Sequence, residues 1–106
     1  MKVAIPLFKD RVSPHFSTAP EMLLVQTEDG RVCATWKIDL ARLSSAERRV
    51  KFLGLGIETL FCGGIDRATR CWFEKQGIRV ADNRMGNAME MLNGHLNLTK
   101  YEQSGG

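Results

Sequence analysis

The run KVAIPLF, Lys2 to Phe8, decides the fold of this chain. It is almost continuously apolar, a pattern typical of a central strand that is buried on both faces of a sheet. Pro6 has no N–H group to donate, so we expect strand pairing to stop there. The run therefore predicts a sheet with this strand at its centre.

Two further strand-like runs follow, Glu21 to Gln26 and Arg31 to Ile38. The residues between them end in Asp29-Gly30, a strong hairpin signal. In the second run, apolar residues alternate with polar or small ones, which predicts a strand with one protected face. The residues on that face are Val32, Ala34, Trp36 and Ile38.

The pattern then becomes helical. Ser44 and Glu47 have the spacing that satisfies the free N–H groups at a helix start, and we expect a helix from there to about Leu53. Its buried face is predicted to consist of Ala46, Val50 and Leu53, and its solvent face of Glu47, Arg48 and Lys51.

The rest of the chain alternates between short apolar runs and helical segments. We expect strands at Glu58 to Cys62 and Ile78 to Ala81, and helices at Asp66 to Gln76 and Gly86 to Leu96. Residues 101–106 are predicted to be a loose tail. Hairpin-connected strands followed by strand–helix–strand–helix predict an α/β fold with a mixed sheet, whose later strands are parallel to the first by right-handed crossovers.

Composition limits the class of protein. The 106 residues suit one domain, no boundary or repeat is visible, and we expect a single domain over 1–106. The apolar runs are too short to cross a bilayer, which favours a cytoplasmic protein that does not contact a membrane. A net charge of +3 with scattered cations gives no support for a nucleic-acid partner. Three cysteines without CxxC spacing argue against disulfides and a closed zinc site.

Three segments are candidates for one site, because ligands in an open α/β sheet bind beyond the carboxyl ends of the parallel strands. These segments are residues 9–20, 62–66 and 82–86. Arg11 and Arg84 would add positive charge there. Met85, together with Met89 and Met91, either lines the crevice or packs in the core.

Two glycines and a helix start offer an anion site. Gly63 and Gly64 lie between a strand and a helix, where backbone N–H groups and the positive helix end can receive an anion. The alternative is a tight turn that allows close packing. Gly86, before the last helix, presents the same two alternatives.

His15 and Cys62 are the candidate metal ligands. An imidazole in a polar loop ligates soft and borderline metals or, as the alternative, caps the loop by hydrogen bonding. Cys62 is the last residue of a predicted strand and lies next to the glycines and a helix start, where a thiolate is favoured, although free cysteines also serve as small buried hydrophobes.

The order of motifs resembles that of the dinitrogenase iron-molybdenum cofactor biosynthesis family, which includes NifX-like proteins, the carboxy-terminal part of NifB and small stand-alone relatives. The matching motifs are MKVAIP, RVSPHF, the Asp-Gly hairpin, LFCGGI, QGIRV and a glycine-led helix ending NGHL. The resemblance covers almost the whole chain. It implies a ribonuclease-H-like α/β fold with a five-stranded mixed sheet flanked by helices.

The resemblance also implies non-covalent binding of anionic metal-sulfur clusters, either iron-sulfur or molybdenum-containing, or of precursors of the iron-molybdenum cofactor. The family's His-Phe motif falls on His15 and Phe16, and its Gly-Gly-Ile turn on residues 63–65, whereas Ser17 stands where relatives commonly have glycine. The predicted binding set is Arg11, Ser13, His15, Phe16, Cys62, Gly63, Gly64, Arg84 and Gly86, with His15 and Cys62 touching metal.

We therefore expect a carrier rather than an enzyme, acting with cofactor-assembly or nitrogenase-type proteins as a monomer or weak homodimer. One alternative is a regulatory or interaction domain on the same scaffold without a cluster. Another is a nuclease that depends on divalent metal, which needs converging carboxylates. Lys2 to Phe8 contains none, and Asp10, Asp66 and Asp82 lie in predicted loops.

Overall fold

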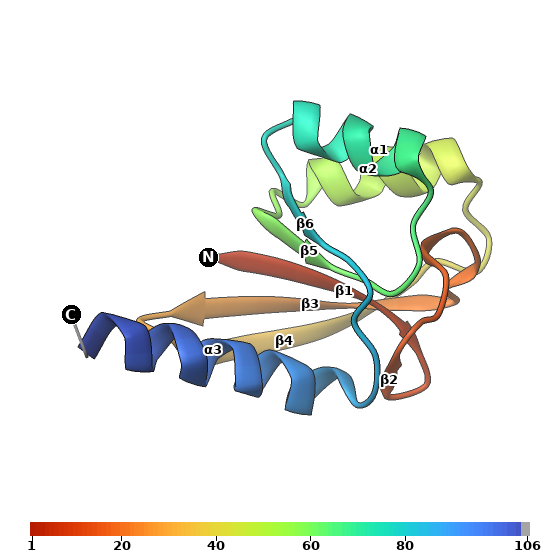
Figure 1. Cartoon of the computed structure of the whole chain (residues 1–106). Coiled ribbons are helices and arrows are strands. Elements are labelled where there is room, and N and C mark those ends of the chain that lie inside the picture. The colour runs from red at the N-terminus through yellow and green to blue at the C-terminus, as the bar shows by residue number, and fades with distance from the viewer. Residues whose placement is uncertain (105–106) are drawn as a thin grey trace.

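The computed structural model describes the backbone of residues 1–104 and the side chains of residues 1–97. A mixed sheet lies between two helical layers, with α1 and α2 on one face and α3 on the other (Figure 1). The strand order is β4-β3-β1-β5-β6, and a short β2 pairs with β1 outside this path. The strands are β1 (Lys2–Phe8), β2 (Arg11–Val12), β3 (Glu21–Glu28), β4 (Arg31–Asp39), β5 (Thr59–Phe61) and β6 (Arg79–Ala81), and the α-helices are α1 (Ser45–Gly54), α2 (Arg67–Lys75) and α3 (Ala88–Ser104).

The first apolar run forms the central strand, as predicted. β1 pairs antiparallel with β3 and parallel with β5, and its five inner residues are buried. Pairing does not stop at Pro6, so that expectation is wrong: Pro6 lies opposite Met22, and its carbonyl accepts a hydrogen bond from the Ser13 N–H at 2.8 Å. The missing N–H of proline is tolerated because β5 pairs only with Val3 and Ala4, so no residue of β5 lies beside Pro6 to receive a donor.

The core occupies both faces of the sheet. Phe52 of α1 and Phe73 of α2 pack with Leu60 on one face. Leu92 of α3 packs with Ile5 on the other. Burial on both faces accounts for the continuous apolar pattern of β1, because Val3, Ile5 and Leu7 belong to the core on the α3 side and Ala4 to the core on the other side.

Helix α1 is rotated relative to the prediction. Its capping box is present, with Ser44 Oγ accepting from the Glu47 N–H and Glu47 Oε1 accepting from the Ser44 N–H, both at 3.1 Å. However, the buried residues are Arg48 and Phe52, while Ala46, Val50 and Leu53 are exposed. Arg48 is accommodated inside because four backbone carbonyls surround its guanidinium group, those of Phe16, Ala19, Leu40 and Leu43.

Strand β4 does not present one protected face. A β-bulge shifts its register against β3 near Gln26 and Thr27, so Val32 packs toward the α3 layer and Ile38 toward the α1–α2 layer. Trp36 remains 49% exposed, because β4 is an edge strand.

The end of the last helix and two short elements also differ from the sequence prediction. Helix α3 continues to Ser104 rather than ending near Leu96, since no glycine or proline interrupts residues 95–104. The loose tail is therefore wrong for residues 101–104, and residues 105–106 lie outside the described part. The prediction also lacked β2 and a 3₁₀ turn at Phe16–Thr18. Within the described residues, no helix combines the length and apolarity needed to span a membrane.

Candidate functional site

Three chain segments meet beyond the carboxyl ends of β1, β5 and β6, and the prediction that they lie together is confirmed. The Gly64 N–H donates to the Pro14 carbonyl at 2.6 Å, which joins the first segment to the second. The Asn83 N–H donates to the Gly63 carbonyl at 3.0 Å, which joins the second to the third. The Val12 N–H donates to the Gly86 carbonyl at 2.9 Å and closes the ring.

A groove of about 540 Å³ opens at this junction. Two arginines line it, Arg11 and Arg84, and both are exposed. None of the lining residues, all of which lie in the described part, is a carboxylate. Two large apolar side chains contribute to the lining, Phe8 at 52% exposure and Met85 at 79%. The lining residues are Phe8, Arg11, Val12, Pro14, Gly63, Gly64, Asn83, Arg84, Met85 and Gly86.

The two consecutive glycines allow backbone segments to approach each other closely. A Cβ atom on Gly63 would collide with the Ser13 carbonyl oxygen, and one on Gly64 would lie 2.8 Å from the Pro14 carbonyl oxygen. The Gly64 carbonyl also accepts from the Phe16 N–H at 2.8 Å. The tight-turn alternative is thus sufficient to explain these glycines, and the N–H of Gly64 is already bonded within the protein.

The helix starts near the groove carry acceptors of their own. Asp66 caps α2, accepting from the Thr69 N–H at 3.0 Å and the Thr69 hydroxyl at 2.6 Å, and these hydrogen bonds lower the pKa of the Asp66 carboxyl. The Asn87 side chain accepts from the Glu90 N–H at 3.0 Å at the start of α3. Because these helix N–H groups already donate to side chains, the two arginines are the main attraction for an anion in the groove.

His15 lies beside the groove rather than in it. It is exposed and lines a smaller hollow of about 350 Å³, which shares only Gly64 with the groove. Ser17 and Asp66 also line that hollow. A group seated in the groove would therefore have to extend past Gly64 to reach the imidazole.

Ser13 and Phe16 hold the loop that carries His15. Ser13 is buried, and its hydroxyl donates to the His15 carbonyl at 3.1 Å. The Phe16 ring is buried against Phe52 and Phe73, with centroid distances of 5.2 and 5.5 Å. Both side chains are therefore placed to support the loop, not to face the groove.

Cys62 belongs to the core. Its side chain is fully buried, and burial, assisted by the negative charge of Asp82 and opposed by Arg70, raises the pKa of the thiol to about 12. The expected thiolate is disfavoured here because desolvation outweighs the attraction of nearby positive charge. The alternative of a small buried hydrophobe fits this position.

Cys62 is expected to resist alkylation in the folded protein. At pH 8 a thiol with this pKa is ionised to roughly one part in 10⁴, whereas Cys33 and Cys71 are exposed. Iodoacetamide labelling followed by peptide mass spectrometry should modify Cys33 and Cys71 in the native protein, and Cys62 only in urea. Equal labelling rates for Cys62 and Cys33 in the native protein would contradict its burial.

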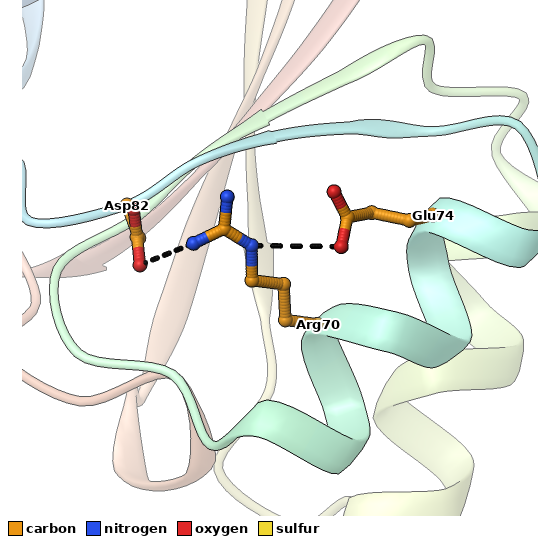
Figure 2. Close-up of polar contacts among 3 residues, drawn as sticks. All are labelled: Arg70, Glu74 and Asp82. Atoms are coloured by element: carbon orange, nitrogen blue, oxygen red, sulfur yellow. Dashed lines mark hydrogen bonds and ion pairs between the residues drawn. The ribbon is translucent and has the colours of Figure 1, made fainter.

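Arg70 fixes the third segment of the site (Figure 2). Its guanidinium contacts the Asp82 carboxylate at 2.8 Å and the Glu74 carboxylate at 3.5 Å, tying α2 to the loop after β6. Two residues further on, the Arg84 N–H donates to the Cys62 carbonyl at 2.9 Å. The backbone that carries Arg84 is therefore held by α2, through Asp82, and by the residue that follows β5, through the Cys62 carbonyl.

The predicted binding set lacked four groove residues, Phe8, Val12, Pro14 and Asn83, although the last three lie within the predicted segments. Phe8 was assigned to the strand alone, although its position at the carboxyl end of β1 is the signal that could have identified it. Met85 lines the groove, whereas Met89 and Met91 pack against the core, so the methionines divide between the two roles considered for them.

A sequence profile of the dinitrogenase iron-molybdenum cofactor family matches residues 1–97. The chain belongs to this family. Among curated proteins, none matches the chain significantly.

Solved structures show the same fold. Their sequence identities to this chain are too low to indicate a shared function. PH0822 superimposes with a TM-score of 0.86 and 22% identity, over 92% of this chain and 89% of its own. MJ0327 from Methanocaldococcus jannaschii, provisionally named a dinitrogenase, gives a TM-score of 0.74 and 20% identity, over 92% and 88% of the two chains. TM1290 from Thermotoga, provisionally named a NifB protein, gives 0.67 and 20%, over 91% and 87%. The ribonuclease-H-like α/β fold expected of the family is confirmed.

Proposed function

We propose that this member of the dinitrogenase iron-molybdenum cofactor family binds an anionic metal-sulfur cluster, or a precursor of the iron-molybdenum cofactor, and carries it as cargo. The observation that supports this most is the pair Arg11 and Arg84 in a groove whose lining includes no carboxylate. Family membership supports the class of cargo.

The chemistry of the groove suits such a cargo. Guanidinium groups donate several hydrogen bonds to an anion, and apolar neighbours such as Phe8 and Met85 reduce the screening of that attraction by water. A volume of about 540 Å³ is within the range of small-molecule sites. Among the described side chains, no three residues of the types His, Cys, Asp or Glu are arranged to hold a metal ion. The guanidinium groups would hold a cluster mainly through charge attraction and hydrogen bonds, and such binding suits a cargo that must be released.

His15 is proposed as the one protein ligand to metal. Its hollow adjoins the groove at Gly64, so an imidazole nitrogen would meet the edge of a cluster that extends past this residue. Cys62 is not part of the proposed site, because its thiol is buried and neutral.

The biological setting completes the proposal. We place the carrier in the cytoplasm as a monomer or weak homodimer, receiving cargo from or passing it to cofactor-assembly or nitrogenase-type proteins. Its role is binding and transfer, and no catalytic residue is proposed. The nuclease alternative gains nothing from the structure, because Asp10 pairs with Lys37, Asp66 caps α2 and Asp82 pairs with Arg70.

Anaerobic titration with tetrathiomolybdate tests the groove. Binding to the native protein is expected to shift the visible absorption of the anion. Arg11→Ala and Arg84→Ala should each raise Kd about ten-fold, equivalent to roughly 1.4 kcal/mol. Higher ionic strength should raise Kd more for the native protein than for either arginine variant, because the attraction that the arginines supply is electrostatic. His15→Ala should alter the spectrum of the bound species as well as its affinity.

Arg31→Ala is the matched control. It removes the same charge from the start of β4, at the opposite end of the sheet from the groove, and should leave Kd within about two-fold. Equal losses in Arg31→Ala and Arg11→Ala would mean that the anion responds only to net charge. Full affinity in both groove variants would refute the site.

A further inference from the structure

Two large apolar side chains border the groove beside its arginines, and both are exposed. Phe8 ends β1 and is 52% exposed, and Met85 lies in the loop after β6 and is 79% exposed. They come from distant parts of the chain, yet they line the same groove as Arg11 and Arg84. Exposed apolar surface that gathers around a groove is typical of a place where a ligand binds.

Neither side chain is held there by the packing of the core. Within the described residues, the core clusters on the two faces of the sheet include neither Phe8 nor Met85. Met89 and Met91, in contrast, pack against the cluster on the α3 side. Polar residues would therefore be tolerated at positions 8 and 85 as far as stability is concerned, and apolar residues there need another explanation.

Much of the backbone around the groove is already hydrogen-bonded inside the protein. Four N–H groups of the lining residues donate to carbonyl oxygens of the chain, namely those of Val12, Gly64, Asn83 and Arg84. Sites for phosphate and similar oxyanions present several backbone N–H groups to the ligand. These four groups are not available to an oxyanion, whose side-chain donors in the groove would be Arg11, Arg84 and Asn83.

We propose that Phe8 and Met85 make the groove selective for a sulfide-rich anion over an oxyanion of the same charge and shape. This inference rests on the proposed function and adds the residues that set the preference. The arginines supply the attraction that both kinds of anion share, and the two apolar side chains supply the discrimination.

Hydration is the physical reason for this preference. Molybdate and tetrathiomolybdate are both tetrahedral anions of charge −2. The oxygen atoms of molybdate hold water strongly, so contact with apolar side chains costs free energy that only hydrogen-bond donors could offset. The sulfur atoms of tetrathiomolybdate are larger, softer and less strongly hydrated. Contact with the Phe8 ring and the Met85 thioether therefore costs this anion less and gains more dispersion attraction.

A comparison of these two anions tests the proposal. Kd for tetrathiomolybdate is measured anaerobically from its visible absorption, and Kd for molybdate from its displacement of tetrathiomolybdate. The native protein should bind molybdate at least about ten-fold more weakly. Met85→Gln and Phe8→Thr should each lower the ratio of the two Kd values about three-fold, chiefly by weakening tetrathiomolybdate, and the double variant should bring the ratio close to one.

Three variants serve as controls. Arg11→Ala should raise both Kd values and leave their ratio within about two-fold of the native ratio, because both anions share the charge attraction. Trp36→Thr and Leu53→Gln are matched to Phe8→Thr and Met85→Gln. Trp36 is 49% exposed on the edge strand β4, Leu53 is exposed near the end of α1, and neither lines the groove. Both controls should keep the native Kd values.

The possible failures can be told apart. Similar Kd values for the two anions in the native protein would overturn the selectivity and leave the anion site of the proposed function in place. A ratio that stays at the native value in both Met85→Gln and Phe8→Thr would assign the preference to other residues and overturn the proposal. An equal fall of the ratio in Trp36→Thr would indicate unspecific apolar contact. Binding of neither anion would overturn the proposed function as well.

Discussion

Arg48→Met is expected to lower the free energy of unfolding by about 3 kcal/mol. The Arg48 side chain is 5% exposed, and its donors bond to carbonyl oxygens of Phe16, Ala19, Leu40 and Leu43, with distances of 3.1 Å to Leu40 and 3.4 Å to Leu43. Methionine fills a similar volume but donates nothing, so buried acceptors lose their partners. Urea unfolding should show a lower midpoint with an unchanged m-value.

Two further variants make the Arg48 result specific. Arg49→Met removes the neighbouring charge, whose guanidinium lies over Trp72 at the surface, and should cost less than about 1 kcal/mol. Arg48→Lys keeps the charge and some donors without the planar fork, so its stability should lie between those of native protein and Arg48→Met. Equal stability of the two methionine variants would contradict the role assigned to the buried carbonyl contacts.

The loss of these hydrogen bonds should also affect the candidate site. Arg48 binds carbonyls at both ends of the Phe16–Thr18 turn, which directly follows His15. At a temperature where Arg48→Met remains folded, the His15 imidazole resonances should show altered positions or broadening. Arg49→Met should leave those resonances unchanged.

Gly63→Ala is expected to cost about 2 to 3 kcal/mol of stability and to abolish tetrathiomolybdate binding. The added methyl would meet the Ser13 carbonyl oxygen and approach the Pro14 carbonyl oxygen to 3.0 Å, and both are backbone atoms that cannot swing aside. Relief requires the first and second segments of the site to separate. Pro14 lines the groove, so this separation deforms the groove wall.

Gly94→Ala supplies a control of opposite sign. Gly94 lies within α3, and a Cβ built there meets nothing within 4 Å. Alanine in a helix is more favourable than glycine by about 0.5 to 1 kcal/mol, so this variant should be more stable than the native protein. Thermal and urea unfolding of the two variants would separate a steric cost from a general effect of adding a methyl. A stable Gly63→Ala variant with normal anion binding would refute the close-approach explanation.

Much of the fold could be predicted because it rests on local patterns. The apolar run of β1, the Asp29-Gly30 turn and the Ser44–Glu47 capping box each act within a few residues, and all three are present in the structure. The failures include the orientation of α1, the bulge in β4 and the length of α3. The first two depend on partners distant in sequence.

The candidate site divides in the same way. Topology placed the three segments together, and Arg11, Arg84 and the glycines line one groove as a consequence. The sequence could not show that Phe16 and Cys62 turn into the core, or that His15 lines a separate hollow. A side chain at the end of a strand can point to either side, and only the neighbouring layers decide which.

By itself, the sequence determined the α/β architecture, the order of its elements and the edge of the sheet where the loops gather. These follow from hydrophobic periodicity and from turn and capping residues, whose energies are local. The tertiary structure alone decided that an arginine would be buried on α1 while Ala46, Val50 and Leu53 face solvent. Burial of a guanidinium group is favourable only when acceptors surround it, and its four carbonyls come from residues 16, 19, 40 and 43, which meet only once the chain has folded.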